Sequence, residues 1–167
     1  NNGATLTIDS DVTIRASGPF NNQSGTINNN GSMAFSDDFL NAGTIAFSQN
    51  SSIELDGEDQ IFAGGSYGSM VVSGTGTKQM QGDVTIEGTL TLSSGSLDLN
   101  GYTLTVNGFL DHAGGQIIGQ GNLVLDYSEW YVSASGSDSN DGSAESPFAT
   151  IAHAVDLSSD NDVIYVS

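Results

Sequence analysis

Apolar residues in pairs, separated by one polar residue, recur throughout the stretch from Gly82 to Leu125. The first residues of successive pairs lie six or seven positions apart, and a glycine precedes nearly every pair. Alternation of apolar and polar residues is typical of a strand with one buried side, and glycine tolerates the backbone angles of tight corners. The pattern predicts very short strands joined by corners, led by Val84, Leu90, Leu97, Leu104, Leu110, Ile117 and Leu123.

Three successive units span 20 residues, as the pairs Val84/Leu104, Leu90/Leu110 and Leu97/Ile117 show. In a three-sided coil of that length, each strand stacks on its counterpart one turn later. The sequence therefore predicts an all-β fold, a parallel β-helix or β-solenoid of about six three-sided coils.

The same spacing extends towards the N-terminus, where the apolar lead positions are Leu6/Ile8, Val12/Ile14, Ile27, Met33, Phe39, Ile45 and Ile53/Leu55. Two stretches lack it. Residues 56–70 are predicted to be irregular, and residues 73–81 to form a turn-rich link to the regular block. No 3.6-residue periodicity precedes residue 145, so no helix is predicted there.

The pattern changes after Asp126. An aromatic cluster, Tyr127–Tyr131, contains the only tryptophan, Trp130. Trp130 and Tyr131 are predicted to pack between the solenoid and a cap helix. Ser146 and Pro147 favour a helix start, because serine caps helices and proline suits the first helical position. One short amphipathic helix is expected near 147–158, with an apolar face of Phe148, Ile151, Ala152, Val155 and Leu157.

A strand is predicted at 163–166, after the polar stretch that ends the helix. Two domains follow from these elements. Residues 1–127 form the β-solenoid. Residues 128–167 form a strand, a polar turn, the cap helix and the first strand of a following β-helix.

Residues 130–166 resemble the opening segment of right-handed parallel β-helix proteins of the pectate-lyase-like superfamily. The matching residues are Tyr131-Val-Ser, Gly136–Ser143, Pro147-Phe148, Thr150-Ile151, Ala154-Val155 and Asp162–Val166. The resemblance implies a helix that caps the start of a β-helix. Residues 20–126 separately resemble glycine- and asparagine-rich β-solenoid repeats of secreted Bacteroidetes-type adhesins, above all from Gly95 to Gly108.

The family's opening segment lies at the C-terminal end of this sequence. Residues 162–167 followed by residues 1–18 would make an uninterrupted set of coils. Three explanations are open. The sequence is one period of a tandem array, or separate copies stack head to tail, or the sequence is a fragment truncated at residue 167. We expect a mature or excised piece of an extracellular protein.

The charge balance restricts the partners. Lysine and arginine total 2 against 20 acidic residues, a net charge of −18. Nucleic acids and anionic membrane surfaces need basic clusters, so neither is an expected partner. There is no cysteine and no apolar run of 18 residues, which excludes disulfides, thiolate metal sites and membrane insertion. Divalent cations and neutral sugars remain compatible, and the Asn/Ser/Thr/Gly-rich composition predicts a bacterial secreted or cell-surface location.

No catalytic constellation is identified, and the chain is not predicted to be an enzyme. The resemblance implies that lyases on this scaffold use a basic residue and calcium-binding carboxylates, but only Arg15 and Lys78 are basic, and both are expected to be solvated surface charges. The carboxylates occur mostly at corners, where aspartate stabilises turns: Asp37, Asp38, Asp56, Glu58, Asp59 and Asp98. The two histidines, His112 and His153, stand alone.

One stretch resembles a calcium-binding loop. Asp138, Asn140 and Asp141 place alternating oxygen donors before Gly142, although the spacing departs from the EF-hand pattern and no bidentate glutamate follows. Calcium is thus the one candidate cofactor. The alternative interpretation is an Asx-type turn that joins a strand to the cap helix.

Two further features bear on sugars. Asparagine-glycosylation triplets begin at Asn22, Asn30 and Asn50, a weak pattern in an Asn/Ser-rich chain. Tyr67, Tyr102 and Phe109 are candidates for exposed rings that stack on sugars, or for side chains that cover a coil edge.

The sequence therefore predicts a structural or adhesive extracellular β-solenoid module of a bacterial stalk, fibre or adhesin, which associates with itself along the solenoid axis. The alternatives are a non-catalytic portion of a polysaccharide lyase or hydrolase, and a carbohydrate-binding β-helix.

Overall fold

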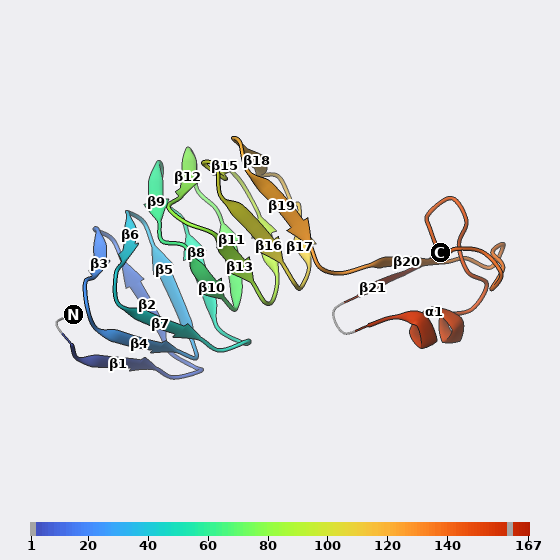
Figure 1. The fold of residues 1–167 in the computed structure, drawn as a ribbon, viewed down its shortest axis with the longest axis horizontal. Coiled ribbons are helices and arrows are strands. Elements are labelled where there is room, and N and C mark those ends of the chain that lie inside the picture. The colour runs from blue at the N-terminus through green and yellow to red at the C-terminus, as the bar shows by residue number, and fades with distance from the viewer. Residues whose placement is uncertain (1–2, 160–161) are drawn as a thin grey trace. The chain divides into compact units, whose positions relative to one another are not determined.

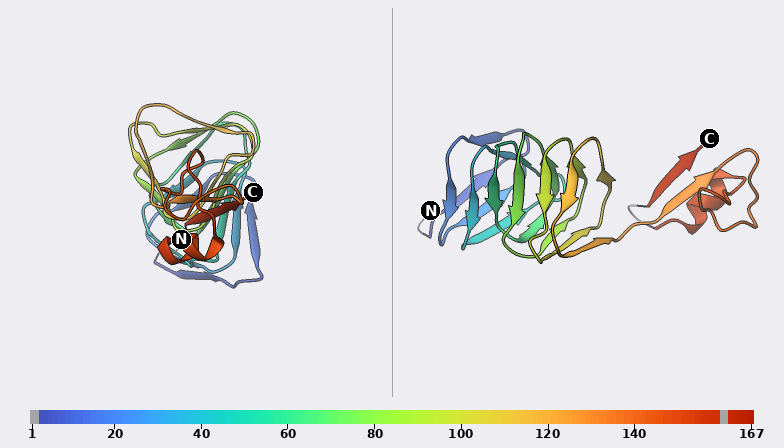
Figure 2. Two further views of the ribbon diagram at one scale, coloured as in Figure 1. Left: turned by 90° about the vertical axis from the view of Figure 1, so that its right-hand side faces the viewer. Right: turned by 90° about the horizontal axis from the view of Figure 1, so that it is seen from above.

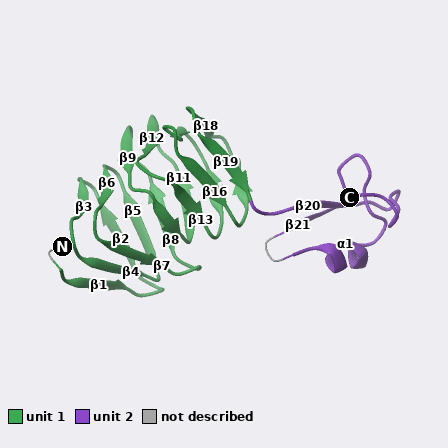
Figure 3. Cartoon of the chain, viewed as in Figure 1, with its two compact units in different colours: residues 1–125 green, residues 126–167 purple. Residues whose placement is uncertain are grey.

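The computed structural model describes residues 3–159 and 162–167. Two compact units make up the chain, unit 1 (Asn1–Leu125) and unit 2 (Asp126–Ser167), which Figure 3 distinguishes by colour. Unit 1 consists of short strands, and unit 2 contains two strands and one helix.

Unit 1 is a parallel β-solenoid with three sides (Figures 1 and 2). Its strands are β1 (Thr5–Ile8), β2 (Thr13–Ala16), β3 (Phe20–Asn22), β4 (Thr26–Asn29), β5 (Ser32–Phe35), β6 (Phe39–Asn41), β7 (Thr44–Phe47), β8 (Ser52–Leu55), β9 (Gln60–Phe62), β10 (Gly65–Tyr67), β11 (Ser69–Val72), β12 (Thr77–Met80), β13 (Val84–Ile86), β14 (Leu90–Leu92), β15 (Ser96–Asp98), β16 (Thr103–Val106), β17 (Leu110–Asp111), β18 (Gln116–Ile118) and β19 (Asn122–Leu125).

Each coil contributes one strand to each side. One side contains β1-β4-β7 and β10-β13-β16-β19, the second β2-β5-β8-β11-β14-β17, and the third β3-β6-β9-β12-β15-β18. The strands thus make about six coils, as the sequence predicts, and β19 begins a further turn.

The predicted coil length of 20 residues is confirmed in the regular block. Val84 pairs in parallel with Leu104, Leu90 with Leu110, and Leu97 with Ile117. Like residues therefore stack on like residues, and these apolar side chains form continuous rows inside the solenoid.

The core of unit 1 consists of the inward side chains of all three sides. In the regular block, Val84, Leu90, Leu97 and Leu104 are at most 1% exposed. Bulkier rings fill the N-terminal half, where Phe35 and Phe39 stack with centroids 4.5 Å apart. In that half, aromatic side chains take the place of aliphatic ones at inward positions. The interior therefore stays filled although the coils vary in length.

Three sequence predictions for unit 1 are wrong. Residues 56–70 are not irregular, because they contain β9 and β10, and the link 73–81 contains β12. The inward position is polar in two of these strands, Gln60 in β9 and Lys78 in β12, so the apolar alternation that reveals the other strands is interrupted. Val12 was predicted to lead a strand, but it precedes β2 and is 41% exposed.

Unit 2 contains β20 (Glu129–Val132), α1 (Ile151–Leu157) and β21 (Val163–Val166). The predicted last strand is therefore confirmed, and it pairs in parallel with β20. Val132, Phe148 and Ala154 form a small core, against which Trp130 and Ile164 pack. The Trp130 ring stacks on Phe148 at 5.6 Å, whereas Tyr131, which points to the other face of the sheet, stacks on Tyr165 at 4.9 Å.

The predicted helix is present, but it starts later than Ser146-Pro147 suggested. Phe148 remains extended because it forms a parallel bridge with Val132. The helix cap is Thr150, whose hydroxyl oxygen accepts a hydrogen bond from the His153 N–H at 3.2 Å. The predicted apolar face is also wrong in part, since Ala154 is buried whereas Ile151, Val155 and Leu157 are 52%, 53% and 50% exposed.

Candidate functional site

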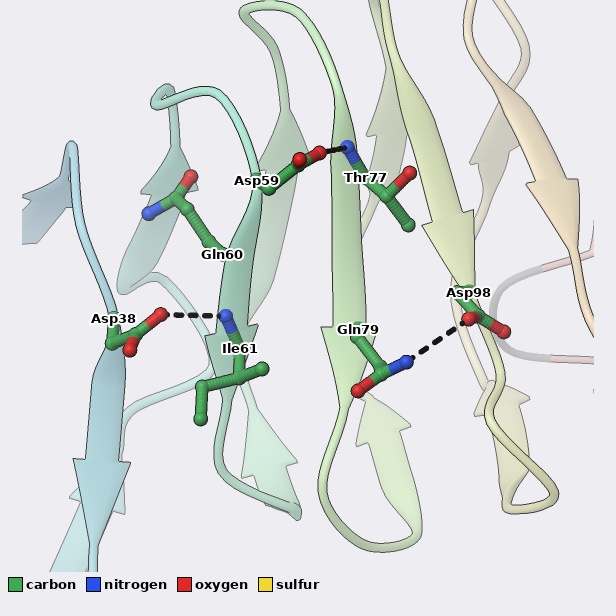
Figure 4. Close-up of a pocket in the computed structure, with 7 residues that line it drawn as sticks. All are labelled: Asp38, Asp59, Gln60, Ile61, Thr77, Gln79 and Asp98. Atoms are coloured by element: carbon green, nitrogen blue, oxygen red, sulfur yellow. Dashed lines mark hydrogen bonds between the residues drawn. The ribbon is translucent and has the colours of Figure 1, made fainter.

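The outer face of the third side carries a hollow of about 430 Å³, which Figure 4 shows in close-up. Because side chains alternate along a strand, the outward residues of β9, β12 and β15 face this hollow. Its lining consists of Asp38, Asp59, Ile61, Thr77, Gln79 and Asp98, together with Gln60, which is buried at the start of β9.

Strand register brings these residues together from successive coils. Ile61 pairs with Gln79, and Gln79 pairs with Asp98, so their side chains form one row across β9, β12 and β15. Asp38 and Asp59 lie at the corners that precede β6 and β9. The stacking of coils thus brings together residues that are 18 to 23 positions apart in the sequence.

Hydrogen bonds fix the carboxylates of this hollow. The Ile61 N–H donates to Asp38 Oδ1 at 2.9 Å, and the Thr77 N–H donates to Asp59 Oδ1 at 2.8 Å. The Gln79 side-chain amide donates to Asp98 Oδ2 at 3.3 Å, as the dashed lines in Figure 4 mark. Each carboxylate links its own coil to a neighbouring coil, which gives these aspartates a structural role.

The chemistry of the hollow suits a neutral ligand with many hydroxyl groups. A carboxylate has about four lone-pair sites, so Asp38 and Asp59 still have acceptor capacity beyond their backbone hydrogen bonds. No lysine, arginine or histidine is among the lining residues. An anionic ligand would therefore be repelled, whereas sugar hydroxyls could donate to these oxygens.

A second hollow of about 320 Å³ lies on the same side, lined by Asn21, Leu40, Asn41, Ala42, Ala63, Gly64 and Gln81. The Gln81 side-chain amide donates to Gln79 Oε1 at 3.2 Å and so connects the linings of the two hollows. Together the two hollows extend across several coils of unit 1.

The two basic residues differ in their surroundings. Arg15 is exposed, as predicted, and pairs with Glu54 and Asp56. Lys78 was predicted to be a solvated surface charge, and this is wrong, because its side chain is fully buried. The error follows from the position of Lys78, which faces inward in β12.

The remaining acidic candidates serve local structure. Asp37 accepts a hydrogen bond from the Asp38 N–H at 2.7 Å, and Glu58 is exposed at a corner. Asp56 accepts from the Ser36 hydroxyl at 2.6 Å. That hydrogen bond, reinforced by Arg15, lowers the pKa of Asp56 below its usual value despite partial desolvation.

The three calcium candidates bind their own loop. Asp138 Oδ1 accepts from the N–H groups of Ala149 and Thr150, both at 2.9 Å, and Oδ2 accepts from the Thr150 hydroxyl. The Asn140 amide donates to the Pro147 carbonyl at 2.8 Å, and Asp141 accepts from the Ser143 N–H at 3.0 Å. These contacts form the Asx-type connection to the helix that the sequence offered as the alternative.

Desolvation opposes ionisation of Asp138, but its hydrogen bonds from Thr150 and Ala149 outweigh it and lower the pKa of this carboxyl. Within residues 3–159 and 162–167, no three histidine or carboxylate side chains gather as a metal site would require. Calcium binding by Asp138, Asn140 and Asp141 stays a prediction.

The histidines and the candidate sugar-stacking rings occupy separate places. His112 bonds to the Gly115 carbonyl, and the His153 ring packs edge-on against Phe148 at 4.7 Å. Tyr67 is 2% exposed, so its prediction as an exposed ring is wrong, and burial raises the pKa of its hydroxyl. Tyr102 and Phe109 are half-buried.

The first glycosylation triplet is inaccessible, since Asn22 is fully buried and its amide donates to the Gly25 carbonyl at 3.1 Å. Asn30 and Asn50 are exposed.

In the part of the chain that the structure describes, no helix has the length and apolar character needed to cross a membrane. The chain matches no protein-family model, no curated protein and no solved structure, so the superfamily resemblance of residues 130–166 stays a prediction.

Proposed function

We propose that the chain is a structural module of an extracellular bacterial stalk, fibre or adhesin. The observation that carries this proposal is the uninterrupted core of unit 1, whose inward rows continue from coil to coil. Among the described residues, no buried side-chain nitrogen or oxygen lacks a hydrogen-bond partner. A filled and fully bonded interior suits a rigid spacer, which at ~4.8 Å per coil extends by ~30 Å over six coils.

The proposed module associates with further copies along the solenoid axis. Support comes from β19, whose Leu123, Val124 and Leu125 are 41%, 44% and 44% exposed. Among the described strands, only β16 pairs with it. A strand with a free edge and apolar neighbours favours the addition of another strand.

The strand, polar loop, helix and parallel strand of unit 2 have the order that the pectate-lyase-like resemblance implies. We therefore include in the proposal that unit 2 opens a further right-handed β-helix. The same resemblance supports a second origin, a non-catalytic portion of a polysaccharide lyase or hydrolase.

Sedimentation velocity over a wide range of protein concentration tests axial association. We expect species larger than the 17.2 kDa chain, increasing with concentration. The variant Leu123→Lys places a charge on the inward row that ends at β19, and should abolish the larger species. Val124→Lys is the matched control, because Val124 points outward in the same strand, and should leave them unchanged.

A monomer at every concentration would contradict the axial association, and so would equal effects of Leu123→Lys and Val124→Lys. The spacer role is tested separately, by inserting one extra 20-residue coil after Gly101. The longer chain should fold with undiminished thermal stability if the coils act as interchangeable units.

Carbohydrate binding is a second candidate function, favoured by the hollow between Asp38 and Asp98. A glycan array should show binding to neutral glycans and none to acidic ones. Asp98→Asn together with Thr77→Val should weaken it, whereas Asp111→Asn, on another side of the solenoid, should not. Absence of binding to every glycan would remove this candidate.

A further inference from the structure

Lys78 lies inside the solenoid with all three ammonium donors in use. Its Nζ donates to the backbone carbonyls of Gly57 at 2.6 Å, Glu58 at 2.7 Å and Thr75 at 2.6 Å. An ammonium group has three N–H donors and no acceptor, so these bonds satisfy it completely. The residue is fully buried and is the only lysine in the chain.

The three carbonyls come from corners of two successive coils. Gly57 and Glu58 lie between β8 and β9, and Thr75 lies between β11 and β12. Thr75 is flanked by Gly74 and Gly76, whose φ angles of 75° and 72° are in the left-handed region that glycine tolerates. A Cβ on Gly74 would lie 2.4 Å from the carbonyl oxygens of both Asp56 and Gly57, so only glycine allows the two corners to approach this closely.

The residues stacked on Lys78 show where this polar arrangement ends. In the preceding coil its partner is Gln60, whose side chain donates to the carbonyls of Phe35 and Asp37 and accepts from the Gly57 N–H. In the following coil its partner is Leu97, which is fully buried and apolar. The cation therefore sits at the end of the polar part of this row, next to the apolar part that begins at Leu97.

Three carboxylates near Lys78 favour its charged form, although the net effect of the surroundings is a lowered pKa. Burial lowers the pKa of Lys78, and the carboxylates of Asp59, Asp56 and Glu58 act in the opposite direction. Ring-like groups of backbone carbonyls are also how proteins bind free cations.

We propose that the carbonyls of Gly57, Glu58 and Thr75 form a binding site for a primary ammonium ion, which Lys78 occupies as a tethered ligand. The lysine replaces a soluble cation at this corner and joins the two coils. Its site therefore needs no ion from the medium.

Chemical rescue tests the proposal. Lys78→Ala removes the atoms of one propylammonium ion and should lower the Tm by about 10 °C, since three carbonyls lose their charged donor. Propylammonium chloride should then raise the Tm of the variant by about 3 °C more than an equal concentration of sodium chloride. Propyltrimethylammonium, which has no N–H donor, should act no better than sodium.

Met80→Ala is the matched control, because Met80 is fully buried on the same strand and lacks a polar group. Propylammonium should not stabilise it beyond sodium chloride. Equal stabilisation of both variants, or equal effects of propylammonium and propyltrimethylammonium, would overturn the proposal.

A measurement on the unmodified protein covers the case in which Lys78→Ala does not fold. In protein labelled with 15N-lysine, the single side-chain ammonium should give a 1H–15N signal at neutral pH, because bonded ammonium protons exchange slowly with water. Rapid acetylation of Lys78 in the folded protein, or loss of that signal under native conditions, would contradict the proposal.

Discussion

Arg15 and Glu54 lie two coils apart on the outer face of one sheet, with Nη2 and Oε2 separated by 3.5 Å. In the register of β2, β5 and β8, the residue between them is Ala34. The small alanine lets the guanidinium pass over the intervening strand and also reach Asp56. One side chain thus connects the first and third coils across the second, near the N-terminal end of the solenoid.

Arg15→Gln should lower the free energy of unfolding by only about 0.5 kcal/mol, because exposed ion pairs contribute little in water. Urea denaturation of both proteins at low salt measures the difference. It should shrink in 0.5 M sodium chloride, where exposed charges are screened. A loss that is large or independent of salt would show that Arg15 acts through packing instead.

Stability should fall in acid partly because of Asp56. Its folded-state pKa is lowered, chiefly by the Ser36 hydroxyl with a further contribution from Arg15. Because this pKa is lower in the folded state, ionised Asp56 stabilises the folded protein at pH values above the unfolded-state pKa of ~3.9. The stabilisation is lost as the pH falls through the folded-state pKa. Asp56→Asn should therefore flatten the decline of Tm between about pH 5 and pH 2, relative to the unmodified chain.

Asp37→Asn controls for the loss of one negative charge at a nearby corner. If the Tm of Asp56→Asn declines with falling pH as steeply as that of the unmodified protein, Asp56 does not contribute to the loss of stability in acid.

A column of glycines should be sensitive to one added methyl group. Gly68, Gly88 and Gly108 occupy equivalent corners 20 residues apart, and the Gly88 N–H donates to the Gly68 carbonyl at 2.7 Å. A Cβ on Gly108 would lie 2.1 Å from the Gly88 carbonyl oxygen. Gly108→Ala should lower the free energy of unfolding by about 2–3 kcal/mol, because the two backbones must separate.

Two other glycines separate crowding from backbone conformation. Gly18→Ala adds a methyl group in open space at an ordinary φ, and should be neutral or slightly stabilising. Gly101→Ala also meets no atom, but its φ of 88° should make it destabilising by about 1 kcal/mol. Equal losses in all three variants, measured by urea denaturation, would contradict the packing argument.

The sequence could predict the coils wherever the inward residues are apolar. Leu90 and Leu110 reveal both strand and register, since the alternation and the 20-residue spacing are visible together. The pattern fails at Gln60 and Lys78, where hydrogen bonds to corner carbonyls replace apolar contacts inside the solenoid. A lysine that follows turn glycines at an inward position of the alternation is a signal that could be sought in a sequence. Its carbonyl partners, however, can be identified only when the coils are stacked.

The candidate site shows the same limit. Asp38, Asp59 and Asp98 were identified individually as corner carboxylates, and the structure brings all three to one hollow. Gln79 and Thr77 were missed because the strand that carries them was predicted to be a turn-rich link. Which corners lie side by side depends on the number of residues in each coil. This number varies in the N-terminal half, where the step from Leu6 to its partner Ile27 is longer than the step from Ile27 to its partner Ile45.

Asp138 provides a prediction that separates a structural carboxylate from a calcium ligand. Its two oxygens accept three hydrogen bonds from Ala149 and Thr150 at the start of α1. Asp138→Ala should therefore lower the unfolding temperature of unit 2 in the presence of EDTA. Trp130 is the only tryptophan and packs on Phe148 in the core of unit 2, so its fluorescence reports this unit within the full chain.

Ser139→Ala is the control, because it changes a neighbouring exposed side chain of the same loop and leaves the bonds of Asp138 intact. Calcium should shift the transition of the unmodified protein little, since the carboxylate oxygens already bind the loop. If the unmodified protein gains stability in calcium, and Asp138→Ala loses that gain while behaving normally in EDTA, then Asp138 is a calcium ligand. In that case, the hydrogen bonds that Asp138 accepts from Thr150 and Ala149 belong to the ion-free form of the loop.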